Sequence, residues 1–274
     1  DNGKEEIDWE RLKDTVRLAV RFLDNVIDVN KFPLPQIAEM TRKTRKIGLG
    51  VMGFADMLIQ LGIAYDSEKA LKTAEEVMAF VNTEAHKTSE ELAGERGVFP
   101  AYKGSVYDKN GGPKMRNASC TTIAPTGTLS IIAGCSSGIE PLFGLAFVRY
   151  VMNARNLLEV NGEFVRAARA GGFYSAGLIK ALAAGASLSE IKEVPAGVKR
   201  LFTTSLEIAP ARHVRMQAAF QKHVDNAVSK TVNLPRRASH EDVAGVYILA
   251  YEQGLKGITI YRDRSRPNQP LASG

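Results

Sequence analysis

Apolar residues recur at helical spacing through the first third of the chain. The spacing predicts a helix over residues 8–26, with Asp8 as its N-cap, and the prolines in residues 32–35 then break it. Two further helices are predicted over residues 51–61 and 67–92, the second with Ser67 at its N-terminus. The glycine-rich, polar stretch 97–113 is typical of a loop.

Short apolar runs alternate with helical patterns in the rest of the chain. Strands are predicted over residues 120–123, 228–234 and 257–261. Helices are predicted over residues 128–132, in short pieces within 163–200, over 210–223, and from a capping box at Ser239 to Gly254. Strands that alternate with helices through short connections are typical of a parallel α/β fold. Because no repeat or linker divides the chain, we expect one α/β unit.

Composition excludes several classes of protein. The 274 residues are 45% hydrophobic and 24% charged, which is typical of a folded globular chain. The net charge of +6 permits a phosphate-bearing partner but does not demand nucleic acid. Two cysteines and no Cys/His cluster give neither a disulfide scaffold nor a metal site, and no apolar run spans a bilayer. A reducing cytoplasm is therefore the expected location.

Two conspicuous motifs are better explained by structure than by chemistry. Residues 48–53 fit G-x-G-x-x-G, but a basic, polar segment precedes them where a dinucleotide-binding fold needs a buried strand. These glycines are therefore interpreted as sites of close backbone packing. The basic cluster in that segment, with no aromatic residues interleaved, is interpreted as a solvated face. It comprises Arg42, Lys43, Arg45 and Lys46.

The segment 124–130 is the strongest candidate for a binding site. Pro125 keeps the preceding residue extended, and Gly127 lets the backbone turn closely against a ligand. Unpaired amides at the start of a helix, with hydroxyls beside them, would form a cradle for a phosphate or diphosphate. A hydroxyl-rich N-cap without any ligand explains the same residues about equally well, although a second Gly/Ser loop at 134–141 favours a site. The candidate residues are Ala124, Pro125, Thr126, Gly127, Thr128, Leu129 and Ser130.

No other residue carries a clear chemical role. Cys120 and Cys135 have no acid–base partner nearby in the sequence, so both are interpreted as small buried side chains. The four histidines are scattered and are interpreted as structural or surface residues rather than metal ligands.

Several ordered motifs resemble the catalytic subunit of ribonucleotide reductase. The stretch 121–130 and the Ser-Ser-Gly-Ile-Glu-Pro of 136–141 carry the resemblance most clearly. Three more stretches agree, in the family's order, and extend the resemblance over roughly residues 8–266: 45–56, then 216–221 with 225–233, then 254–257 with 261–263.

Within this family the chain is most similar to the adenosylcobalamin-dependent class. Family members that receive their radical from a separate metal-containing subunit resemble one another in two adjacent tyrosines near the last strand. Here that place reads Tyr261-Arg262. A single tyrosine beside an arginine would break such a relay, as expected where a bound cobalamin makes the radical.

The resemblance implies a ten-stranded α/β barrel, of which residues 1–274 would supply the later strands and helices as a C-terminal fragment. It implies radical reduction of ribonucleotides to 2′-deoxyribonucleotides for DNA synthesis, with adenosylcobalamin as cofactor and a thioredoxin-like dithiol as reductant. Residues 125–129, within the candidate site 124–130, match the family's substrate-phosphate loop. The substrate would be a ribonucleoside di- or triphosphate. The resemblance is compatible with a homodimer of the full-length protein, and it implies no membrane and no direct nucleic-acid partner.

The departures from the family pattern limit what this fragment can do alone. The family's radical cysteine lies in an Asn-x-Cys-x-Glu motif that is absent here, and the tail 264–270 has no cysteine pair. The sequence therefore assigns no catalytic residue and no metal ligand to this fragment, which we expect to be inactive without the N-terminal half of the barrel. Two alternatives stay open: the large subunit of a metal-radical two-subunit reductase, and a non-catalytic nucleotide-phosphate-binding relic.

Overall fold

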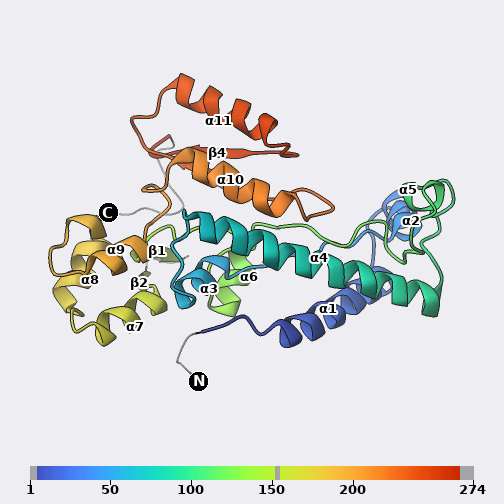
Figure 1. Cartoon of the computed structure of the whole chain (residues 1–274), viewed down its shortest axis with the longest axis horizontal. Coiled ribbons are helices and arrows are strands. Elements are labelled where there is room, and N and C mark those ends of the chain that lie inside the picture. Colours follow the sequence, from blue (N-terminus) through green and yellow to red (C-terminus); the bar gives the residue numbers. More distant parts are fainter. Residues whose placement is uncertain (1–4, 152–154, 266–274) are drawn as a thin grey trace.

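The computed structural model describes residues 5–151 and 155–265. Two long helices, α1 (Trp9–Val29) and α4 (Glu68–Arg96), lie side by side along the molecule (Figure 1). The first half of the chain also contains α2 (Pro35–Thr44), α3 (Phe54–Gln60), α5 (Val106–Lys109) and α6 (Gly127–Ala133). The second half contains a hairpin of β1 (Ala146–Val151) and β2 (Arg155–Val160), then α7 (Gly162–Ala170), α8 (Ala176–Ala183), η1 (Leu188–Glu190) and α9 (Ala196–Leu201). The C-terminal part contains α10 (Pro210–Gln221), β3 (Thr231–Leu234), α11 (His240–Glu252) and β4 (Thr259–Arg262).

The predicted helix starts are confirmed where a side chain caps them. Asp8 accepts a hydrogen bond from the amide of Arg11, and Ser67 accepts one from Ala70. Ser239 and Asp242 form the reciprocal capping box at the start of α11. A capping side chain replaces the hydrogen-bond partners that the first amides of a helix lack. The start of each of these helices is therefore determined by residues no more than three positions apart in the sequence.

The expected parallel α/β fold is confirmed in part, because the described residues are mostly helical. The only parallel strand pair among them is β3–β4, and β1–β2 is an antiparallel hairpin that the periodicity did not predict. The predicted strand at 120–123 makes only isolated parallel bridges, Leu49 to Thr121 and Ile123 to Val228. These contacts nonetheless place four extended segments side by side, in parallel and in chain order, as the later strands of a barrel require. The segments are 47–49, 119–123, 227–234 and 259–262.

Residues 32–46 contain a helix that the periodicity did not predict. The predicted break is confirmed, because α1 ends at Val29, and Pro35 then begins α2, since proline is well tolerated in the first turn of a helix. The interpretation of the basic cluster is wrong at one residue. Arg45 is buried, whereas Arg42, Lys43 and Lys46 lie on the surface. The basic cluster is therefore a solvated face except at Arg45, which turns inward at φ 45° after the end of α2.

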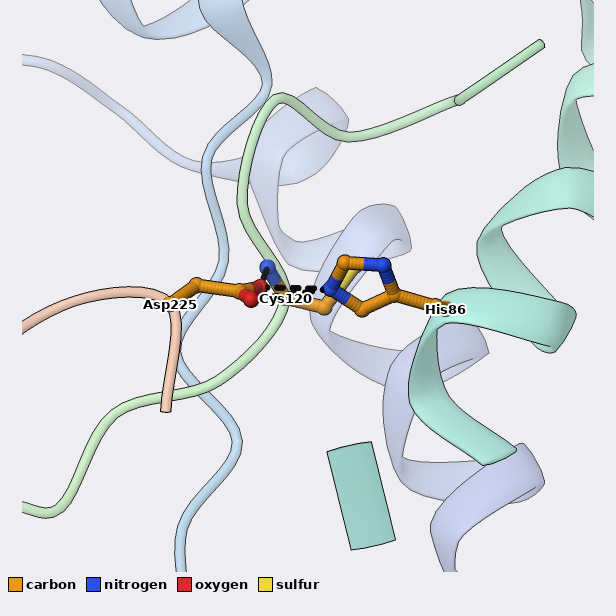
Figure 2. Close-up of side chains that lie close together, drawn as sticks. All are labelled: His86, Cys120 and Asp225. Carbon is orange, nitrogen blue, oxygen red and sulfur yellow. Dashed lines mark hydrogen bonds and ion pairs between the residues drawn. The ribbon is translucent and has the colours of Figure 1, made fainter. Parts of the chain in front are cut away.

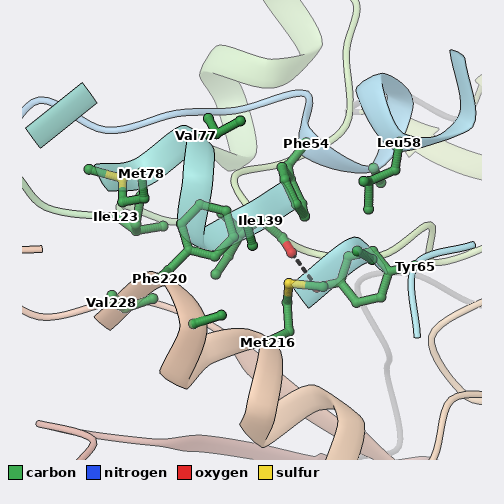
Figure 3. Packing of buried hydrophobic residues seen from close by; sticks show 14 of the residues in the cluster. Phe54, Leu58, Tyr65, Val77, Met78, Ile123, Ile139, Met216, Phe220 and Val228 are labelled. Carbon is green, nitrogen blue, oxygen red and sulfur yellow. Dashed lines mark hydrogen bonds between the residues drawn. The ribbon is translucent and has the colours of Figure 1, made fainter. Parts of the chain in front are cut away.

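The main hydrophobic core lies between α3, α4 and α10. Figure 3 shows Phe220 of α10 against Phe54 of α3, with Val77 and Met78 of α4 beside them. The Phe54 and Phe220 rings meet edge to face at 4.9 Å between centroids. This core fixes the start of α3 beside the loops that follow residue 123.

Several large apolar side chains remain exposed, as a partial barrel predicts. Leu129, Ile131 and Ile132 of α6 are 60%, 53% and 79% exposed, and α1 exposes Leu18 and Phe22. Within the described part of the chain, no helix has the length and apolar character needed to cross a membrane. Residues 266–270 of the predicted cysteine-free tail lie outside the described residues.

Candidate functional site

The 124–130 turn leads from an extended segment directly into α6. Thr126, the N-cap of α6, has φ 55° and ψ 25°, and no side chain caps the helix. A β-branched residue in this left-handed region is strained by roughly 1–3 kcal/mol, so the surrounding contacts must hold it there. The first amides of α6 consequently have no partner within the helix and face away from it.

The hydroxyl groups of the turn differ in their surroundings. Ser130 is buried, and its hydroxyl donates to the carbonyl of Gly127 at 3.3 Å. The Thr126 hydroxyl oxygen accepts from the amide of Gly138 at 2.7 Å. Thr128 is exposed. Of the three hydroxyls predicted to face a ligand, the structure therefore leaves Thr128 open to solvent and uses the other two inside the protein.

The remaining candidate residues form the outer surface of the turn. Ala124, Pro125, Gly127 and Leu129 are exposed. A Cβ atom placed on Gly127 would meet nothing within 4 Å, so the space in front of the turn is open. The turn thus offers open space at Gly127, the first backbone amides of α6 and one exposed hydroxyl, that of Thr128.

The second loop, residues 134–141, packs directly against the turn. Ser137 donates its hydroxyl to the carbonyl of Pro125 at 2.5 Å. A Cβ atom on Gly138 would lie 3.0 Å from the carbonyl oxygen of Ala124, which explains the glycine there together with its φ of 47°. The two loops that the sequence places in succession are therefore one hydrogen-bonded unit.

The start of α3 is hydrogen-bonded to the second loop of this unit. Asp56 accepts from the amide of Ser136 at 2.5 Å, and the amide of Gly53 donates to the carbonyl of Ser136 at 2.7 Å. Gly50 approaches the carbonyl of Thr122 so closely that a Cβ atom would lie 2.2 Å from it. The packing interpretation of the glycines in 48–53 is confirmed at Gly50.

A second group of chemically capable side chains lies on the other side of residues 119–123. Figure 2 shows His86 of α4 beside Cys120 and Asp225. His86 Nε2 lies 2.8 Å and 2.9 Å from the two carboxylate oxygens of Asp225, and Asp225 also accepts from the amides of Cys120 and Thr121. Asp225 therefore joins His86 of α4 to the backbone of the extended segment, and these bonds account for the group as a structural contact.

Neither cysteine is arranged as a nucleophile. Cys120 is buried, and burial raises the pKa of its thiol to about 12, with the Asp225 carboxylate adding to the effect. Burial also raises the pKa of Cys135, which is only half-buried, contrary to the expectation for this residue. Thiols with raised pKa values carry little thiolate at neutral pH, so the structure assigns neither a redox role.

Sequence reasoning missed a buried charge centre beside the two loops. Lys230 is 1% exposed and pairs with Glu140, while Nδ1 of His213 on α10 lies 3.0 Å from its ammonium nitrogen. Burial, followed by the nearby Lys230 ammonium, lowers the pKa of His213 to about 3, so this imidazole is neutral. The sequence signal was Glu140 in the Gly-Ile-Glu-Pro motif, but its partner lies 90 residues later.

The parallel extended segments and the two-loop unit are compatible with part of a ribonucleotide reductase barrel, and comparison with known proteins shows the family. The family model for the ribonucleotide reductase barrel domain matches residues 1–261, and the chain belongs to this family. It is 55% identical over its full length to a vitamin B12-dependent ribonucleoside-diphosphate reductase of Thermoplasma acidophilum. It is 50% identical over 97% of its length to a Mycobacterium tuberculosis protein with the same name.

The structural comparison agrees with this assignment. The Actinobacillus ureae class Id ribonucleotide reductase alpha subunit superposes with a TM-score of 0.79 at 25% identity, covering 92% of this chain and 47% of that one. The chain spans 35% of the Thermoplasma protein and 38% of the Mycobacterium protein.

Proposed function

We propose that the full-length protein reduces ribonucleotides to 2′-deoxyribonucleotides by a radical reaction that depends on adenosylcobalamin. Membership of the reductase family and the 50–55% identity to two vitamin B12-dependent reductases support this proposal. Residues 1–274 would form the C-terminal part of its catalytic barrel, and a thioredoxin-like dithiol would restore the reducing electrons. The relatives' names favour a ribonucleoside diphosphate as substrate.

The role proposed for this chain is to hold the substrate's phosphates at the 124–130 turn. The single observation that carries it is the uncapped start of α6 behind a strained Thr126. Backbone amides there would donate to phosphate oxygens, and the exposed Thr128 hydroxyl would add another donor. Binding the phosphates would orient the ribose toward the radical chemistry supplied by the rest of the barrel.

Adenosylcobalamin, when bound, supplies the initiating radical by cleavage of its cobalt–carbon bond. Among the described residues, no group of side chains is identified as a binding site for the corrin ring. At the last strand, the Tyr261 hydroxyl is buried without a hydrogen-bond partner, while Arg262 Nε donates to the carbonyl of Ala238. Arg262 cannot continue a tyrosine relay, which favours a radical made locally.

Substitution in the turn tests the phosphate role. In the full-length protein, Thr128→Val removes one donor without changing shape, and Thr126→Ala removes the contact to Gly138. We expect the double variant to raise KM for CDP about tenfold, because one lost hydrogen bond to a charged group corresponds to about 1.5–3 kcal/mol. Thr83→Val, at an exposed position of α4, serves as the matched control. An unchanged KM in the double variant would rule out this phosphate site.

A separate measurement distinguishes the proposed activity from its two alternatives. The full-length protein should form deoxynucleotide when adenosylcobalamin and a dithiol are added, with no second protein present. Activity that requires a diiron or dimanganese subunit would identify a two-subunit reductase instead. Nucleotide binding without turnover under either condition would identify a non-catalytic relic.

A further inference from the structure

The ammonium group of Lys230 is fully enclosed and fully bonded. The residue is 1% exposed, and its Nζ lies 2.8 Å from Glu140 Oε2, 3.0 Å from His213 Nδ1 and 3.0 Å from the carbonyl oxygen of Thr231. An ammonium has three protons, and each one has an acceptor here. The side chain therefore has one allowed position.

Each partner of Lys230 is in turn fixed by a further bond. Glu140 Oε1 accepts from the amide of Thr231 at 2.6 Å. His213 Nε2 lies 3.0 Å from the carbonyl of Ser205, so Nε2 carries the proton and Nδ1 is free to accept from Lys230. A buried network in which every member is satisfied specifies one arrangement of the elements that it joins.

The element fixed most directly is the loop that shapes the 124–130 turn. Glu140 lies two residues after Gly138, whose amide holds the Thr126 hydroxyl oxygen at 2.7 Å. Between them, the carbonyl of Ile139 accepts from the buried Tyr65 hydroxyl at 2.5 Å, as Figure 3 shows. A short, rigid connection therefore links the Lys230 ammonium to the strained residue of the turn.

Stability alone does not explain such a pair. Buried ion pairs often contribute little net stability, because removing two charges from water offsets their attraction. A left-handed threonine, by contrast, persists only where its surroundings over-determine it. We propose that Lys230 is a positioning residue that, through Glu140, holds the 124–130 turn in the conformation that binds the substrate's phosphates. This inference rests on the proposed function of the turn.

The test uses the full-length protein with CDP as substrate. Lys230→Met should raise KM for CDP about tenfold and leave kcat within about twofold. A purely structural role would reduce the fraction of folded enzyme, which lowers the apparent kcat and leaves KM unchanged. Asp24→Asn is the matched control, because Asp24 is also a fully buried charge with several partners and lies outside the two loops.

A second variant keeps the test decisive if Lys230→Met folds poorly. Lys230→Met combined with Glu140→Gln removes both charges, so no unpaired charge remains buried. The combined variant should melt closer to the unmodified protein and still show the raised KM. Failure of both variants to fold would make the network structural and overturn the proposal, as would an unchanged KM or an equal rise in Asp24→Asn.

The turn variant distinguishes the positioning role of Lys230 from the phosphate-binding role of the turn. If Thr126→Ala with Thr128→Val raises KM and the Lys230 variants do not, the positioning role is wrong and the phosphate turn stands. If the turn variant leaves KM unchanged, the phosphate turn is wrong and the positioning role is wrong with it.

Discussion

Two buried charge networks lie near opposite ends of α4, and their central charges have opposite signs. At the C-terminal end, the fully buried Asp24 carboxylate is surrounded by the guanidinium groups of Arg45, Arg96 and Arg116. Near the N-terminal end, the fully buried Lys230 ammonium lies 5.9 Å from the Tyr65 ring centre, three residues before α4 begins. A 29-residue helix is roughly 43 Å long, so the two networks are independent.

The difference lies in what each network joins. Asp24 holds α1 to the end of α4 and to Asn117 in the segment before the extended chain, which are all parts of the scaffold. Lys230 holds a loop that also contacts the start of α3, the Tyr65 hydroxyl and, through Gly138, the 124–130 turn. Similar physics, a buried charge with several partners, thus stabilises helix packing in one place and fixes a loop beside the 124–130 turn in the other.

The largest expected effect comes from removing the Asp24 carboxylate. Asp24→Ala leaves the buried Arg45, with Arg96 and Arg116 beside it, without their shared partner, which should lower the free energy of unfolding by about 3–5 kcal/mol. Urea unfolding of the full-length protein measures the loss. KM for CDP should stay unchanged in the folded fraction, and a raised KM would show that this network also shapes the site.

An intermediate effect is expected from the titration of His213. Its folded pKa of about 3 lies below the usual 6.5, because burial and then Lys230 disfavour the charged form. Unfolding therefore takes up a proton below pH 6.5, and the free energy of unfolding should fall by about 2 kcal/mol between pH 7 and pH 5 from this residue. Urea titrations at several pH values measure the slope.

The control for this pH dependence of stability is His213→Gln, because glutamine keeps a hydrogen-bond donor and an acceptor but does not titrate. The fall in stability between pH 7 and pH 5 should be smaller by the same amount in this variant. An identical slope in both proteins would contradict the buried, neutral imidazole.

The smallest expected effect is at the solvent-exposed edge of the Asp24 network. The Asp28 side chain is 52% exposed, and its hydrogen bond to Arg45 lowers the pKa of its carboxyl group. Asp28→Asn should reduce the free energy of unfolding by no more than about 1 kcal/mol, because water screens an exposed ion pair. A loss as large as that of Asp24→Ala would show that burial is not what separates the two positions.

Much of the helical structure could be predicted because its signals are local. The caps at Asp8, Ser67 and Ser239 act within three residues, and the structure confirms all three. The β1–β2 hairpin was missed, and so was α2, which begins at Pro35 directly after the predicted break. In both places short-range patterns allow more than one structure, and tertiary packing selects among them.

The candidate site also has one part that the sequence predicted and one part that depends on tertiary packing. Proline, glycine and hydroxyl residues in 124–130 were enough to predict a sharp turn before a helix, because backbone conformation follows from those residue types. Which hydroxyl faces solvent was not predictable. Thr126 and Ser130 are engaged inside the protein only because Gly138 and the first turn of α6 lie beside them.

By itself, the sequence determined the helices with strong caps, the 124–130 turn and the family to which the chain belongs. Only the tertiary structure decided that Arg45 would be buried beside Asp24 and that Lys230 would lie against Glu140 and His213. The physical reason is the distance along the sequence between the residues that interact. A cap or turn is set by hydrogen bonds between near neighbours, whereas a buried charge is stable only when residues many positions apart, 90 in the case of Glu140 and Lys230, fold to the same place.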